Sequence, residues 1–170
     1  PDEPHEQGVL TEKKVPNMAI SEIPLQSVTY DNLILPDNMT VGGDMNIEVV
    51  RRHTQIQIAL YLIGLQLGYR TWIAQNDKGI IYKDKPLIEQ PGVISALGKE
   101  NIISAFPGAE PSARFIDCIW FQNHRFMPAV MEVEHTTGVT SGLTRMKGLQ
   151  DSMPAFNTRY VIVASDNDRE

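Results

Sequence analysis

The sequence has little cysteine and lacks long apolar runs. Its one cysteine, Cys118, excludes an internal disulfide framework and a multi-cysteine zinc site. No stretch approaches the roughly 18 uninterrupted apolar residues that a membrane span requires. The polar and charged N-terminus does not resemble a signal or transit peptide. Together these absences predict a soluble cytoplasmic protein with no membrane partner.

Basic residues are also scarce. Lysine and arginine together number 15 against 21 aspartates and glutamates, which gives a net charge of −6. Domains that bind nucleic acid usually carry a basic stripe, because neutralising phosphates releases counterions. Attraction to DNA would therefore have to come from local basic residues, from a bound metal ion or from a separate domain.

The 170 residues, 42% of them hydrophobic, suffice for one domain with a core. Residues 1–43 are rich in proline and are expected to form an extended arm or cover. Residues 44–170 carry the periodic patterns of a folded core. Because the chain starts with Pro1 instead of methionine, we expect it to be a fragment of a longer protein.

Hydrophobic periodicity divides the core into helices and strands. A long helix is expected to begin at an N-cap, Asp44, and to end at Gly68. The last run, 159–165, is apolar and β-branched, which is typical of an interior strand. A strand, a helix and a strand in succession predict a parallel crossover and a mixed α/β sheet. Between the long helix and the last strand, the expected elements are a strand at 70–74, a short helix within 93–106, strands at 114–121 and 128–135, and a helix at 140–153.

The two central strands carry a cluster of acidic residues. If they pair as a hairpin with Phe121 facing Pro128, Asp117 lies opposite Glu132, and alternation puts Glu134 on the same face as Glu132. Residues opposite each other in a hairpin have Cβ atoms about 4.5–5.5 Å apart. Like charges at this separation destabilise the strand pair, and burial of the charges increases the free-energy cost. A positive group is therefore expected among them.

Two kinds of positive group could neutralise these carboxylates. One is a divalent cation, since oxygen ligands suit magnesium or manganese. The other is a basic side chain, for which Arg114, Arg145 and Lys147 are the candidates. A third interpretation makes the acids a solvated sheet face, the commonest meaning of alternating charge. The apolar residues on the same face, Phe115, Ile119, Phe121 and Val130, favour a lined pocket instead.

The long helix supplies two polar candidates. His53 and Gln57 lie four residues apart and so share a face, with apolar residues on both sides of Gln57. Such a stripe most often makes core hydrogen bonds. It could also form the second wall of the acidic pocket.

Several ordered motifs resemble the PD-(D/E)xK nuclease superfamily and its restriction-endonuclease-like members. They are H-T-x-x-Q in the long helix, W-x-A-x-N-D after it, D-x-x-W, E-V-E-H-T-T and S-G-L-x-R-M. The resemblance implies an αβββαβ core with a mixed central sheet flanked by helices. It also implies magnesium-dependent cleavage of double-stranded DNA, with manganese as a substitute.

The resemblance also assigns roles to residues. Asp117 and Glu132 take the positions of the metal-binding acids, while His53 and Gln57 fall where first-helix residues approach the metal or the attacking water. Glu134 replaces the motif's lysine. A glutamate cannot supply positive charge, but it could act as a general base or bind a second metal. These five residues form the expected catalytic set.

A competing interpretation is a non-catalytic domain that keeps the nuclease fold for nucleic-acid binding or assembly. Another is an unrelated α/β domain with its carboxylates in solvent. The sequence leaves open a homodimer and a separate DNA-recognition domain.

Overall fold

The computed structural model describes residues 9–12, 21–24, 33–34, 47–134, 139–154 and 157–164. The predicted N-cap Asp44 lies outside these ranges, as do His135 and most of the expected N-terminal arm. Within that arm, β1 (Val9–Glu12) pairs antiparallel with β2 (Ser21–Pro24). A short strand, β3 (Leu33–Ile34), joins β5 (Ile81–Tyr82) and β6 (Lys85–Pro86) in a three-stranded sheet.

The central sheet has four strands in the order β4-β7-β8-β9. β4 pairs antiparallel with β7, β7 antiparallel with β8, and β8 parallel with β9. The long helix α2 precedes this sheet, and α5 connects β8 to β9, so the predicted αβββαβ order and mixed sheet are confirmed. The elements of this core are α2 (Ile47–Gln66), β4 (Arg70–Ile73), β7 (Cys118–Gln122), β8 (Phe126–Glu134), α5 (Val139–Asp151) and β9 (Arg159–Ala164).

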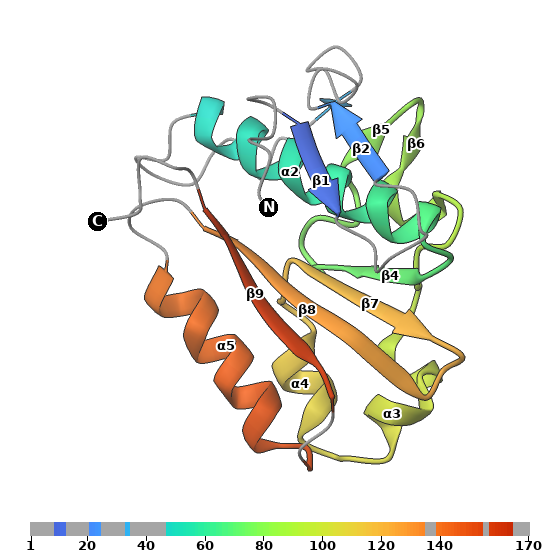
Figure 1. Cartoon of the computed structure of the whole chain (residues 1–170), viewed down its shortest axis with the longest axis vertical. Helices are drawn as coiled ribbons and strands as arrows, with labels where there is room; N and C mark the ends of the chain where they lie inside the picture. The colour runs from blue at the N-terminus through green and yellow to red at the C-terminus, as the bar shows by residue number, and fades with distance from the viewer. Residues whose placement is uncertain are drawn as a thin grey trace, which may run out of the picture.

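Helices cover both faces of the central sheet (Figure 1). On one face, Leu60 of α2 packs with Cys118, Met131 and Val133. The other face is covered by α5 and α4 (Ala109–Ala113), with α3 (Asn101–Ser104) beside them. The core there contains alternate residues of the same strands and two α5 residues: Ile119, Phe121, Val130, Met146 and Leu149.

The helix α2 ends as the sequence predicts. Gly68 adopts a positive φ of 77° just after the last turn, a conformation that glycine reaches without a steric penalty. Gly64 allows the helix to approach the sheet, because a Cβ at this position would lie 2.5 Å from Trp120 Nε1. The C-terminal half of α2 is therefore packed closely against β7, where Trp120 Nε1 donates to the Leu60 carbonyl oxygen at 3.2 Å. Among the described residues, no helix is both long and apolar enough to cross a membrane.

Three local predictions are wrong. The strand expected at 114–121 begins only at Cys118, because α4 extends to Ala113 and a turn follows. The hairpin pairing is as predicted from Cys118 to Trp120, but a bulge then shifts the register, so Phe121 does not pair with Pro128. β9 is an edge strand of its sheet and not an interior one.

Candidate metal and active site

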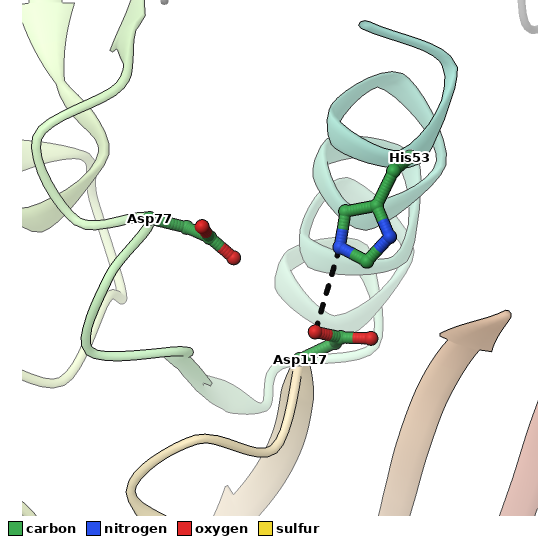
Figure 2. Close-up of side chains that lie close together, drawn as sticks. All are labelled: His53, Asp77 and Asp117. Carbon is green, nitrogen blue, oxygen red and sulfur yellow. Dashed lines mark ion pairs between the residues drawn. The ribbon is translucent and has the colours of Figure 1, made fainter. Parts of the chain in front are cut away.

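Three segments far apart in the sequence bring polar side chains to one point at the end of the central sheet. His53 lies on α2, Asp77 lies in the turn after β4, and Asp117 immediately precedes β7 (Figure 2). One ligand atom from each of the three lies within 4.8 Å of the others. Figure 2 shows the imidazole and the two carboxylates facing a common space.

Asp117 is held from two sides. Its Oδ2 accepts a hydrogen bond of 2.8 Å from the backbone N–H of Val133 on β8. Its Oδ1 lies 3.4 Å from His53 Nε2. The carboxylate is therefore fixed between the hairpin and the long helix, and it is 6% exposed.

Gln57, one turn after His53, is fully buried and positions the same cluster. Its Nε2 donates to Asp77 Oδ2 at 2.9 Å and to the Asp117 carbonyl oxygen at 2.8 Å. Its Oε1 is buried without a hydrogen-bond partner. The amide thus orients the turn that carries Asp77 and leaves one acceptor unused.

Buried Glu132 and half-buried Arg145 form an ion pair on the α5 side of the cluster. Arg145 Nε donates to Glu132 Oε1 at 2.8 Å, and Nη2 donates to Oε2 at 2.7 Å. This two-pronged geometry suits a guanidinium and a carboxylate. Arg145 was one of three basic candidates for neutralising the acids, and the structure places it there. Lys147 instead pairs with Asp151 in solvent, and Arg114 lies over the Phe115 ring.

Glu134 lies beside this pair. Its Oε1 is 3.7 Å from Arg145 Nη2 and has no hydrogen-bond partner, although the residue is only 5% exposed. The backbone of Gly142 on α5 donates to the same carboxylate. A Cβ at position 142 would overlap Glu134 Oε1, so alanine there would force this carboxylate to move.

Burial and mutual charge shift the protonation of these groups. Burial raises the pKa of Glu132 to about 7, and the hydrogen bond from Arg145 offsets part of this shift. Burial also raises the pKa of Asp77 and of Glu134. For Asp117, burial is outweighed by the hydrogen bond and charge of His53 and by the Val133 N–H, so its pKa is lowered. The pKa of His53 is raised, because Asp117 outweighs the effect of burial.

All five expected catalytic residues, His53, Gln57, Asp117, Glu132 and Glu134, belong to this cluster. Phe115, expected to line the pocket, is 42% exposed and lies outside it. Asp77 was missed as an acidic residue, because its surroundings indicate a turn. The W-x-A-x-N-D motif, which ends in Asp77, was the signal that could have identified it.

The donor set fits a divalent cation. Four carboxylates, those of Asp77, Asp117, Glu132 and Glu134, face two side chains that can be positive, His53 and Arg145. With all four carboxylates ionised, the cluster has two negative charges in excess, and buried charges without partners are costly. Arg145 occupies one lone pair on each Glu132 oxygen, while a carboxylate offers about four. Glu132 can therefore bind a cation without losing Arg145.

Comparison with known proteins gives the family. Residues 34–170 match the family described as the C-terminal domain of the type II restriction enzyme NmeDI. The chain is also 54% identical over 171 residues to the type II restriction enzyme NmeDI of Neisseria meningitidis serogroup C. That alignment covers 100% of this chain and 48% of the relative, so the chain spans about half the relative's length. No solved structure matches. The chain therefore belongs to the family of the C-terminal domain of the type II restriction enzyme NmeDI.

Proposed function

We propose that this chain is the catalytic domain of a metal-dependent endonuclease that hydrolyses phosphodiester bonds in double-stranded DNA. The observation that supports this most strongly is the cluster of four largely buried carboxylates, which outnumber the two basic groups paired with them, His53 and Arg145. The relative's name makes restriction-type cleavage the expected activity. The arrangement of the carboxylate cluster also supports a PD-(D/E)xK-like site in which Glu134 stands at the position of the lysine.

Asp117 and Glu132 are the proposed metal ligands. Asp117 immediately precedes β7, Glu132 lies on the neighbouring strand β8, and the two carboxyl groups lie within hydrogen-bonding reach of each other. Magnesium, or manganese in its place, would activate a water molecule and stabilise charge on the phosphate under attack. The Val133 N–H and His53 hold Asp117 in one orientation, as expected of groups that support a metal ligand.

We propose that Arg145 and Glu134 together take over the roles of the lysine that the motif lacks here. Arg145 brings a permanent positive charge to within 3.7 Å of Glu134, the residue at the lysine position. This guanidinium can offset negative charge that develops on a phosphate. Glu134, with a raised pKa and one unpartnered oxygen, is suited to accept a proton from water.

Plasmid cleavage with magnesium or manganese tests this function. We expect the wild-type chain to nick or linearise plasmid DNA, and Asp117→Ala and Glu132→Ala to reduce the rate by at least about 100-fold, the usual cost of one lost electrostatic stabiliser. Glu89→Ala, at an exposed position, is the control and should cleave at the wild-type rate. Wild-type rates in either site variant, or no cleavage by the wild-type chain, would contradict the proposal.

A binding or assembly domain with the same fold is the alternative. Calorimetry distinguishes the two, because a domain without catalysis has no need for a cation. Binding of manganese by the wild-type chain and its loss in Asp117→Ala would support the nuclease. Lack of metal binding by the wild-type chain would favour the alternative.

The partners of the whole protein follow from this proposal. Because the chain carries a net charge of −6 and aligns with 48% of the relative, we propose that a separate domain contributes to DNA recognition. A homodimer would allow both strands to be cut. The test is cleavage by the full-length protein compared with that by this chain.

A further inference from the structure

We infer that His53, Asp77 and Asp117 form a divalent-cation site of their own, on the α2 side of the cluster, which takes manganese or another nitrogen-accepting transition metal in preference to magnesium. The inference rests on the proposed function. It adds Asp77 to the site, makes His53 a ligand and names the class of metal.

The spacing of the three donors supports a single ion. His53 Nε2 and Asp117 Oδ1 are 3.4 Å apart, and all three ligand atoms lie within 4.8 Å of one another. Two ligands at right angles on an ion with bonds of about 2.1 Å are about 3 Å apart, and two opposite ligands about 4.2 Å. A shift of a few tenths of an ångström would therefore bring all three donors onto one ion.

Gln57 provides an independent indication. The residue is fully buried, and its Nε2 already donates to Asp77 and to the Asp117 carbonyl. Its Oε1, on the same amide, is buried with no hydrogen-bond donor. A buried acceptor that lacks a donor destabilises the folded chain. A water molecule bound to a cation at this site would supply that donor.

The α5 side of the cluster, with Glu132, Glu134 and Arg145, differs in charge from the site formed by His53, Asp77 and Asp117. Arg145 donates two hydrogen bonds to Glu132 and lies 3.7 Å from Glu134 Oε1. Positive charge is therefore already present on the α5 side of Asp117. No lysine or arginine is shown bonded to Asp77 in the described part of the chain; its hydrogen-bonded partner is the neutral amide of Gln57. Asp117, with two oxygens, can serve the site on each side.

The donor types determine the class of metal. Magnesium binds oxygen almost exclusively and keeps several waters, whereas manganese, cobalt, nickel and zinc accept an imidazole nitrogen together with carboxylates. An imidazole within this donor set is therefore the feature that selects against magnesium.

Pulsed electron paramagnetic resonance on the manganese-loaded chain detects the nitrogen ligand directly. We expect the bound ion to show modulation from a directly coordinated imidazole nitrogen, and His53→Gln to abolish it. His124→Gln, at a histidine that lies 3.4 Å from Glu100, is the control and should keep the signal. Manganese bound to the wild-type chain without nitrogen modulation would overturn the inference and leave the proposed nuclease intact.

Metal affinity gives the second readout. Asp77→Asn should weaken manganese binding by more than about 10-fold, since even loss of a ligand's supporting partner costs 10–100-fold. Asp84→Asn, an exposed acid in the next turn, is the matched control and should bind as wild type does. Unchanged affinity in Asp77→Asn would overturn the inference. If the wild-type chain bound no manganese at all, this inference and the proposed function would both fail.

Discussion

At the scale of single residues, this molecule repeatedly buries a carboxylate and fixes it with a basic side chain or a backbone N–H. Glu132 is completely buried under Arg145, and Asp117 accepts from Val133. Far from the cluster, Glu100 is also completely buried, with Arg70 Nη1 and Nη2 donating to its two oxygens at 2.7 and 2.6 Å. The first two lie at the proposed site, whereas the third ties β4 to the segment before α3.

Arg70→Met should destabilise the fold by about 2–3 kcal/mol, because it leaves the buried Glu100 carboxylate without its guanidinium. This value lies below the range of about 3–5 kcal/mol for fully buried pairs, since Arg70 is about one-third exposed and His124 Nδ1 lies 3.4 Å from Glu100 Oε1. Urea unfolding measures the change. Lys147→Met, which breaks an exposed pair with Asp151, is the control and should cost less than about 1 kcal/mol. Equal costs for the two variants would contradict this account of Glu100.

The His53–Asp117 pair predicts a pH-dependent stability in metal-free buffer. The pKa of His53 is raised above 6.5, so its contribution is complete below that pH and is lost as pH rises through the raised value. The pKa of Asp117 is lowered below 3.8, so its contribution is lost only as pH falls through the lowered value. The pair therefore stabilises most between about pH 4 and pH 6.5.

His53→Gln should thus reduce the free energy of unfolding more at about pH 5.5 than at about pH 9, with EDTA present throughout. Urea titrations of the variant and the wild type at the two pH values give the difference. A deficit of the same size at both values would show that His53 carries no charge in the folded protein.

At the scale of elements, β8 supplies two acids of the cluster, and α5 supplies the arginine that pairs with them. Alternation along β8 predicted that Glu132 and Glu134 share a face, and both contact Arg145 on α5. Sequence could not identify Asp77, because a turn pattern looks the same whether or not its acid meets a distant helix. It also could not show that β9 lies at the edge, because local apolarity does not encode strand order.

The two glycines of α5 should respond differently to alanine. At Gly148 a Cβ would make an ordinary contact at 3.5 Å from Ser112 Oγ, so Gly148→Ala should stabilise the chain by up to about 1 kcal/mol through helix propensity. At Gly142 a Cβ would displace the Glu134 carboxylate and lie 3.2 Å from Glu132 Cβ. Gly142→Ala should therefore gain little or no stability and lose most of its cleavage rate.

Thermal unfolding and plasmid cleavage, measured on both variants, test this difference. Full activity in Gly142→Ala would show that the position of Glu134 does not matter for the reaction. Loss of activity in Gly148→Ala would show instead that α5 tolerates no change.

At the scale of the whole molecule, one sheet brings α2, the turn after β4 and the β7–β8 hairpin to a single point. The helical and strand periods of the sequence were enough to predict this αβββαβ core, because each of its elements carries its own hydrophobic pattern. The excess of buried negative charge arises only when these elements assemble. The cation that we propose would bind to the assembled fold alone, and it should therefore stabilise the folded chain.

Anomalous diffraction from crystals of the chain grown with manganese tests this most directly. We expect an anomalous peak at bonding distance from the Asp117 carboxylate, and we expect it to be absent in crystals of Asp117→Asn. A wild-type crystal that shows its manganese elsewhere, with nothing bonded to Asp117, would contradict the account.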